Sequence, residues 1–391
     1  MRAVLLVFRN ELHRVLTLRP AFAVLVIAAA LYALLYPQPY LSESLRKSPI
    51  AVVDQDHSTT SRDLIRRLDA TPDVAVLSVD PDLPAAQRRV FARDASGILV
   101  IPEGFERELL RGNSSPVALY ADASYFLIYQ RVALGVVSVV RTLGAEVEVR
   151  RLIGLGVDAP RATAAANPMP LTTIALFNPQ EGYASYVLPA AFVLILQQTL
   201  LIGVGLLGTM PGAASVWRRP DGRSFAGPLA TVSGKLLAYL MLEAVIVPFY
   251  LVVLPYLYGI PRLGSVGAML LFAVPFIMAT GALGLVIAAL FRSPLAVQLT
   301  MAAIGMPFFF LSGFSWPVEA MPKTAQWLAQ LVPSSAAIDG FVRLGQLGAV
   351  LSDVRGQVSV LCSLALAYTL AAVLLEARSR SRLAETEFNR V

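Results

Sequence analysis

A glycine-rich segment that ends in lysine is the first candidate for nucleotide chemistry in this sequence. It reads Gly227-Pro-Leu-Ala-Thr-Val-Ser-Gly234-Lys235-Leu236. A phosphate-binding loop needs four residues between its glycines and a Ser or Thr after the lysine, because that hydroxyl holds magnesium. Here six residues separate the glycines and Leu236 follows the lysine. We therefore predict that this chain binds no nucleotide cofactor of its own.

Side chains that usually catalyse reactions or bind metals are scarce. His13 and His57 are the only histidines and Cys362 is the only cysteine, so we predict no catalytic residue, no metal site and no disulfide within the chain. Asp54 and Asp56 follow a predicted strand, where α/β domains often bind ligands, but a solvated turn is the reading we favour. Cys362 lies in an apolar stretch and is expected to be a small buried side chain.

Three polar residues interrupt long apolar segments. Glu243 is expected near the middle of one segment, facing the interior of a helix bundle or a partner, because a charge in lipid is expensive. The alternative places for Glu243 are a substrate path, a helix interface or a position nearer the membrane surface. Gln197 and Gln198 are expected to form hydrogen bonds between helices or subunits, with substrate contact as the less favoured alternative.

The elements that must position these residues are membrane helices. Of 391 residues, 56% are hydrophobic and 15% are charged, well below the charge of about 25% that is usual for soluble domains. A bilayer core requires about 20 apolar residues in a helix. Six segments meet this need, at residues 20–36, 183–210, 229–258, 265–291, 295–314 and 356–375.

The distribution of basic residues predicts the orientation. If both termini are cytoplasmic, the inside segments carry 13 Lys and Arg against 5 Asp and Glu, and the two short outside loops carry four Lys and Arg. This bias follows the positive-inside rule, which explains the net charge of +6 without nucleic acid as a partner. Residues 1–19 form a predicted amphipathic helix at the cytoplasmic surface, and residues 376–391 a cytoplasmic tail.

Residues 37–182 lie outside the membrane in this topology and are predicted to form an extracytoplasmic α/β domain. Apolar runs begin at Pro49, Val74, Gly97 and Val117, with helical patterns between them, so the order is βαβαβαβ. A longer helical stretch, 124–154, is expected to form a stalk. Residues 315–355 are apolar for a loop and are expected to form short re-entrant or surface helices outside the membrane.

Several motifs together give the chain a resemblance to a known family. They are the segment PIAVVDQDHSTTSRDLIRRL after the first helix, Phe177-Asn178-Pro179, Gly234-Lys235-Leu236-Leu237, and LSGFSWPVEAMP from Leu311 to Pro322. In order and spacing, over essentially the whole chain, they resemble the ABC-2 type permeases, in particular bacterial exporters with a large extracytoplasmic domain.

The resemblance implies a dimer of permeases, from a second copy or a paralogue, in the bacterial inner membrane. It implies a separate cytoplasmic ABC ATPase that carries ATP and magnesium, and in some relatives a periplasmic adaptor. The ATPase would dock on the first helix and the second cytoplasmic segment, where relatives usually carry an acidic stretch. The corresponding residues here are Arg9, Arg14, Trp217, Arg218, Arg219, Asp221, Gly222 and Arg223.

The expected function is therefore a permease subunit of an ATP-driven exporter, not an enzyme. The few polar residues in the spans disfavour an ion-coupled transporter and favour amphiphilic or hydrophobic cargo, such as a drug, a lipid or a secreted compound. The alternative is a membrane anchor that transports nothing and whose outer domain binds a ligand or an envelope partner. The absence of a cytoplasmic output domain in this sequence disfavours that alternative.

Overall fold

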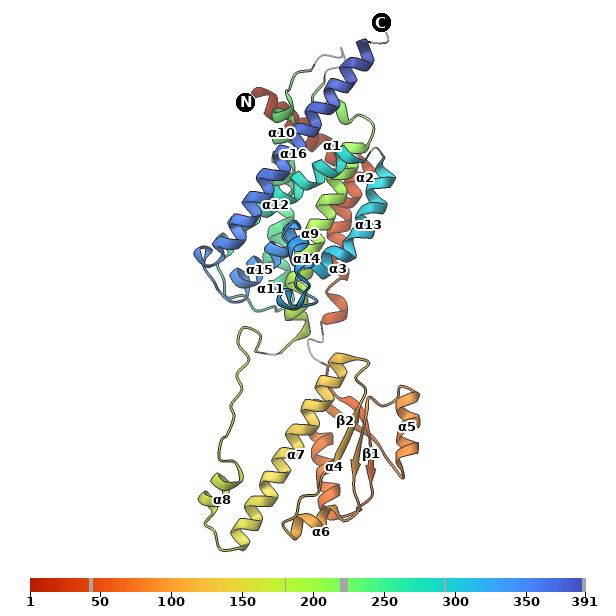
Figure 1. The fold of residues 1–391 in the computed structure, drawn as a ribbon, viewed down its shortest axis with the longest axis vertical. Helices are drawn as coiled ribbons and strands as arrows, with labels where there is room; N and C mark the ends of the chain where they lie inside the picture. The colour runs from red at the N-terminus through yellow and green to blue at the C-terminus, as the bar shows by residue number, and fades with distance from the viewer. Residues whose placement is uncertain (42–44, 180, 219–223, 292, 389–391) are drawn as a thin grey trace. The chain divides into compact units, whose positions relative to one another are not determined.

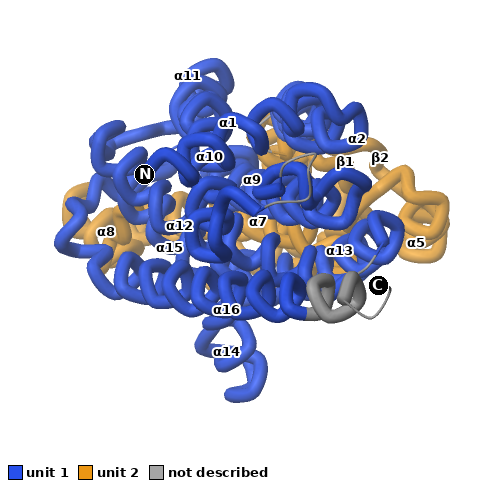
Figure 2. Tube along the Cα trace, turned by 90° about the horizontal axis from the view of Figure 1, so that it is seen from above, with its two compact units in different colours: residues 1–43, 175–391 blue, residues 44–174 orange. Residues whose placement is uncertain are grey.

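The computed structural model describes residues 1–41, 45–179, 181–218, 224–291 and 293–388 (Figure 1). The chain forms two compact units (Figure 2). Unit 1 comprises residues 1–43 and 175–391, and unit 2 comprises residues 44–174. Unit 1 is helical, whereas unit 2 holds a four-stranded sheet. The expected fold class, a polytopic helical membrane protein with an inserted α/β domain, is confirmed.

Within the described residues, six helical segments are long and apolar enough to cross a membrane. They are Arg19–Tyr40, Tyr183–Thr209, Pro228–Leu257, Val266–Leu290, Pro294–Leu311 and Leu351–Ser381. The last span differs most from prediction: its helix α16 runs from Arg355 to Phe388. The expected tail from residue 376 is therefore largely a continuation of this helix, because the basic residues that end the apolar run are also good helix formers.

The other helical elements of unit 1 are assigned as follows. The first span comprises α2 Arg19–Phe22, η1 Ala23–Ala28, α3 Ala29–Leu35 and η2 Gln38–Tyr40, preceded by α1 Arg2–Thr17. The next spans are α9 Tyr183–Thr209, then α10 Pro228–Pro248 with η4 Phe249–Val253 and α11 Leu254–Leu257, then α12 Val266–Leu290 and α13 Pro294–Leu311. Between spans lie η3 Ala213–Val216, η5 Val318–Ala320, α14 Lys323–Ala329 and α15 Pro333–Gly345, and η6 Leu351–Val354 begins the last span.

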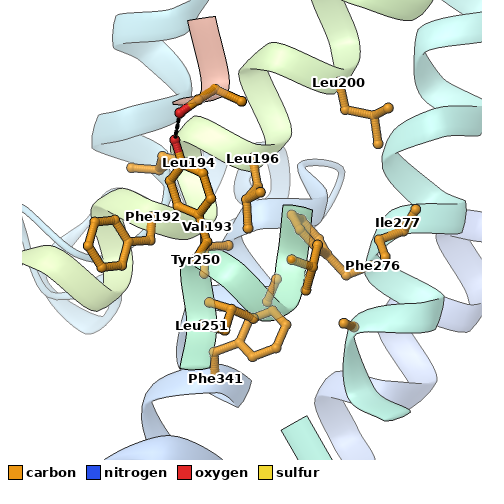
Figure 3. Packing of buried hydrophobic residues seen from close by; sticks show 14 of the residues in the cluster. Phe192, Val193, Leu194, Leu196, Leu200, Tyr250, Leu251, Phe276, Ile277 and Phe341 are labelled. Atoms are coloured by element: carbon orange, nitrogen blue, oxygen red, sulfur yellow. Dashed lines mark hydrogen bonds between the residues drawn. The ribbon is translucent and has the colours of Figure 1, made fainter. Parts of the chain in front are cut away.

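Helix α9 is the centre of the bundle. In the most apolar 18-residue stretch of α9, 83% of the residues are buried. The corresponding share is 11% in α13 and 17% in the last span. Figure 3 shows its side chains Phe192, Leu196 and Leu200 among residues of the neighbouring helices. Cys362 of α16 is exposed, contrary to expectation, because α16 presents much of its apolar surface outward.

Two of the spans contain a π-helical turn, η1 in the first and η4 in the third. Pro248 and Pro255 flank η4 and cannot donate backbone hydrogen bonds, so the helix is locally widened between them. The hydroxyl of Tyr250 in η4 donates a hydrogen bond to the carbonyl oxygen of Ala29, directly after η1 (Figure 3). This bond joins the first and third spans where both helices deviate from α-helical geometry.

Unit 2 contains β1 Ser48–Asp54, β2 Val74–Asp80, β3 Gly97–Ile101 and β4 Ala118–Ala121 in the order β2-β1-β3-β4. The first three strands are parallel and β4 is antiparallel to β3. The helices are α4 Thr59–Ala70, α5 Leu83–Phe91, α6 Phe105–Leu110, α7 Phe126–Gly154 and α8 Ala159–Ala166. Alternate residues of β1 enter different cores: Ile50 and Val52 pack towards α4 and α7, and Ala51 and Val53 towards α5.

The expected helical stalk is part of the domain core in its first half. Val132, Val136, Val139 and Leu143 of α7 recur at helical spacing and are buried in the same cluster as Ile50 and Val52. This half of the helix packs on the domain, because its apolar stripe covers one face of the sheet.

Candidate functional site

Helix α1 and the last turns of α16 lie at the same end of the bundle of unit 1 (Figure 1). At this end α1 packs closely against α10. A Cβ atom on Gly234 would stand 2.7 Å from the Cβ atom of Val7 and 2.8 Å from the carbonyl oxygen of Val4. Such distances are shorter than van der Waals contact, so the close approach of the two helices requires glycine at 234.

A buried polar cluster fastens α1 to the bundle. Glu11 is fully buried and Arg14 is 8% exposed. Arg14 forms an ion pair with Glu11 at 3.1 Å and donates a hydrogen bond to the carbonyl oxygen of Leu207 at 2.8 Å. The hydroxyl of Tyr239 donates to the other carboxylate oxygen of Glu11. Each charged group therefore has a partner, which burial demands, and α1 is joined to both α9 and α10.

This cluster separates the two arginines predicted for α1. Arg9 is exposed on the helix surface, as a docking residue must be. The side chain of Arg14 is instead engaged inside unit 1, so its role here is to hold α1 in place. Helical spacing of apolar residues could not show this, because Glu11 and Arg14 share the buried face with Val7 and Val15.

The second predicted docking segment follows α9. Trp217 is 8% exposed and packs with Val7, Val216 and Ala226. The guanidinium of Arg380 from α16 stacks over the Trp217 ring at 3.8 Å from its centroid. Trp217 thus stabilises the packing at this end of the bundle. Because it is buried, other residues must form any surface that contacts an ATPase.

Arg380 connects three parts of the chain at this site. It donates hydrogen bonds to the carbonyl oxygen of Ala226 at 2.6 Å and to the hydroxyl of Thr231 at 2.7 Å, and it pairs with Glu376 at 2.7 Å. The forked guanidinium makes these contacts together, as a lysine could not. This residue was not singled out by sequence, because it lies in a run of alternating Arg and Ser.

Arg218 forms an isolated antiparallel bridge with Ser224, beside a hydrogen bond from the amide of Phe225 to the carbonyl oxygen of Trp217 at 3.0 Å. The remaining predicted docking residues, Arg219, Asp221, Gly222 and Arg223, lie outside the described residues.

Gln197 joins α9 to the short helix α15. Its side chain is fully buried, and its Oε1 accepts a hydrogen bond from the backbone amide of Ser334 at 2.7 Å. Ser334 lies in the first turn of α15, where helix amides lack partners within the helix. The expected interhelical role is therefore observed within this chain.

Gln198 points to the other side of α9. Its amide nitrogen lies 2.7 Å from where a Cβ atom on Gly305 of α13 would stand, so the glycine makes room for it. Its buried Oε1 has no hydrogen-bond partner among the described residues. The structure thus places Gln198 between α9 and α13, away from Ser334.

Glu243 faces the interior of the bundle. It is 2% exposed and shares its face of α10 with Tyr239 and Val247, four residues away on either side. Its Oε2 atom has no hydrogen-bond partner within the part of the chain that the structure describes. The surface alternative is thereby disfavoured, whereas its part in transport remains a prediction.

Asp54 and Asp56 of unit 2 have structural partners. Asp54 accepts hydrogen bonds from the backbone amides of Asp56 and His57 and from the hydroxyl of Ser61 at 2.8 Å. Asp56 accepts from the backbone amide of Glu106. These contacts shape the turn after β1 and the start of α4. The solvated turn that we favoured is wrong for Asp54, which is only 5% exposed. Lys235, rejected above as a phosphate-loop lysine, lies inside helix α10.

Comparison with known proteins agrees with this architecture. The sequence profile of the family described as "ABC-2 family transporter protein" matches residues 20–374. The linearmycin resistance permease protein LnrN of Bacillus subtilis is 26% identical over 378 residues, which cover 92% of this chain and 96% of that protein.

Two further relatives match a smaller part. The probable multidrug ABC transporter permease YbhS of Escherichia coli is 23% identical over 40% of this chain and 42% of its own length. ABC transporter G family member 20 of Dictyostelium discoideum is 25% identical over 45% of this chain and 24% of its own length. The profile match covers unit 2 and most or all of each of the six helical segments that are long and apolar enough to cross a membrane, and the chain therefore belongs to the ABC-2 family of transporter proteins.

Proposed function

We propose that this chain is the permease subunit of an ATP-driven exporter whose ATP and magnesium are bound by a separate ABC ATPase. Its family supports a transport subunit. The observation that carries the coupling proposal is the buried cluster of Glu11, Arg14 and Tyr239. A partner that moved α1 would move α9 and α10 with it, because these contacts cannot be broken without stranding a buried charge.

The docking surface in this proposal is the exposed side of α1 around Arg9, together with the segment from Arg218 to Arg223. Trp217, directly before that segment, packs with Val7 of α1 and under Arg380 of α16. We place this end of the bundle in the cytoplasm, with both termini, because its loops carry most of the basic residues outside unit 2. Unit 2 is then extracytoplasmic, in a bacterial inner membrane.

A second permease copy or a paralogue completes the proposed transporter. The outward apolar surfaces of α13 and α16 need either lipid or another chain, because little of either helix is buried. A periplasmic adaptor on unit 2 is a further partner that some relatives use.

The proposed cargo is an amphiphilic or hydrophobic compound. The spans contain few ionisable groups, so an ion-coupled mechanism is disfavoured. The relative that matches nearly the full chain is named for resistance to linearmycin, and another is named a probable multidrug permease. Efflux of toxic amphiphiles is accordingly the form of export that we propose.

The test is affinity purification of the tagged full-length chain from its native membranes, followed by identification of bound proteins and an ATPase assay. We expect an ABC ATPase in the eluate and no ATP hydrolysis by the chain alone. Arg9→Glu should reduce ATPase recovery, and Arg161→Glu in unit 2 is the control for a change of surface charge. Recovery of no ATPase from intact membranes would contradict the exporter proposal and favour the anchor alternative.

A further inference from the structure

A cavity of about 620 Å³ opens at the end of the bundle that carries α1 and the last turns of α16. Four helices line it: the last turn of α9, the first turns of α10, the last turns of α12, and α16 around Glu376. Its volume falls within the range of about 300–1,000 Å³ that is usual for small-molecule sites.

One cation of this cavity, Lys235, lies near the start of α10. Lys235 lines the cavity and is 7% exposed. Its ammonium has no hydrogen bond and no ion pair with any residue that the structure describes. The ammonium nitrogen is not among the fully buried polar atoms that lack partners, so it is open to a ligand in the cavity that Lys235 lines.

The other charges at the cavity leave a positive balance. Arg378 lines the cavity and is exposed. Glu376 also lines it, but its carboxylate pairs with Arg380 at 2.7 Å, so that charge is matched. Thr231 and Ser379 add hydroxyl groups. The lining thus offers a ligand two cations and the Ser379 hydroxyl, because Thr231 is fully buried and its hydroxyl already accepts a hydrogen bond from Arg380.

The remainder of the lining is apolar. Val232 of α10, Leu285 of α12 and Ala372 of α16 form part of its wall, and Leu290 at the end of α12 is 63% exposed. A basic rim over an apolar wall at a membrane surface suits a molecule with an anionic head and a hydrocarbon tail. Basic pockets between membrane helices bind anionic lipid head groups for this reason.

We propose that this cavity binds the phosphate head group of an anionic phospholipid from the adjacent leaflet, with Lys235 as its main contact and Arg378 at the mouth. The competing explanation is that Lys235 only offsets the partial negative charge at the carboxyl ends of α9 and α12, whose last turns also line the cavity. Binding at this site requires neither an ATPase nor transport, so it can fail or hold independently of the proposed function.

The first test is native mass spectrometry of the detergent-purified full-length chain titrated with dioleoyl phosphatidylglycerol or dioleoyl phosphatidylcholine. We expect the anionic lipid to bind more tightly, and Lys235→Met to weaken it by about fivefold, the effect of one lost basic contact at a membrane surface. Lys323→Met is the matched control, because Lys323 lies in α14, outside the cavity lining, and should leave binding unchanged. Equal affinity for both lipids, or full binding by Lys235→Met, would overturn the proposal.

Two further measurements test the proposal even if Lys235→Met fails to fold. Arg378→Gln changes only an exposed side chain and should weaken phosphatidylglycerol binding without affecting phosphatidylcholine. In the unmodified chain, phosphatidylglycerol should slow reductive methylation of Lys235 but not of Lys47 or Lys323, the only other lysines. Protection by inorganic phosphate alone that equals the protection by lipid would overturn the assignment to a phospholipid.

Discussion

Gly234 of α10 lies directly against Val7 of α1, so closely that a Cβ atom at residue 234 would stand 2.7 Å from two carbon atoms of Val7. The added Cβ atom would also lie 2.8 Å from the Val4 carbonyl oxygen, which cannot move without moving the α1 backbone. The spacing between α1 and the third span is thus determined by the lack of a side chain at residue 234.

Gly234→Leu should therefore displace α1 while the spans still insert. We expect loss of ATPase co-purification with normal amounts of the chain in the membrane fraction. Gly267→Ala in the first turn of α12 is the control, because its nearest new contact, the Ser265 hydroxyl, would be at an ordinary 3.8 Å. Unchanged ATPase recovery with Gly234→Leu would show that α1 does not form the docking surface.

Arg14→Met should lower thermal stability strongly because it leaves the Glu11 carboxylate buried without its cation. Removal of one partner of a buried ion pair costs about 3–5 kcal/mol. Arg9→Met, on the exposed side of the same helix, should change stability by about 0.5 kcal/mol or less. The thermal midpoint of the purified chain measures both effects. Restored stability in the double variant Glu11→Gln, Arg14→Met would confirm that the stranded carboxylate is the cause.

Arg380→Lys should loosen the contact between α16 and the segment around Trp217. Lysine keeps the charge but cannot contact the Ala226 carbonyl oxygen, the Thr231 hydroxyl and Glu376 together while stacking on an indole ring. We expect a loss of about 2 kcal/mol and faster hydrogen exchange at residues 224–227. Arg378→Lys, two positions earlier and exposed, should leave exchange in that segment unchanged.

Gln197→Leu should lower stability more than Gln198→Leu, because Gln197 has a hydrogen-bonded oxygen beside its unpartnered buried nitrogen. Gln197→Leu removes the acceptor of the Ser334 amide, which costs about 1–3 kcal/mol for an unsatisfied buried donor and should increase hydrogen exchange at the start of α15. Gln198→Leu removes an oxygen that has no partner among the described residues, so stability should be unchanged or higher. Loss of efflux in a stable Gln198→Leu variant would place this residue in the substrate path or at the interface with a second permease.

The start of α4 in unit 2 should depend on pH. Glu106 accepts hydrogen bonds from the hydroxyls of Thr60 and Thr59 and from the amide of Thr60, and these bonds hold the pKa of its carboxyl below its usual value. A lowered carboxyl pKa contributes stability above the unfolded value, about 4.3, and loses it as pH falls through the lower folded value.

Hydrogen exchange at the Thr60 amide, corrected for the intrinsic effect of pH, should therefore show constant protection from pH 7 to pH 5 and a decrease below about pH 4. Glu106→Gln should lower protection at neutral pH and remove the pH dependence. A decrease of equal size in both proteins would assign the effect to other carboxyl groups.

The sequence by itself determined the six spans, the helix before them and the inserted α/β domain. Long apolar runs allow few alternatives, because a lipid-exposed backbone must be helical, and strand runs such as 97–101 were bounded by clear turn residues. The burial of Glu243 also followed from the high cost of a charge in lipid.

Only the tertiary structure decided which polar residues are partners. Arg9 and Arg14 occupy the same short helix, but one is exposed and the other pairs with Glu11 and contacts Leu207, a residue 193 positions away in sequence. Lys235 and Arg378 likewise come together at one cavity from distant helices. Periodicity shows which face of a helix is apolar, whereas pairing between distant helices depends on their relative rotation and spacing, which glycines such as Gly234 set by close contact.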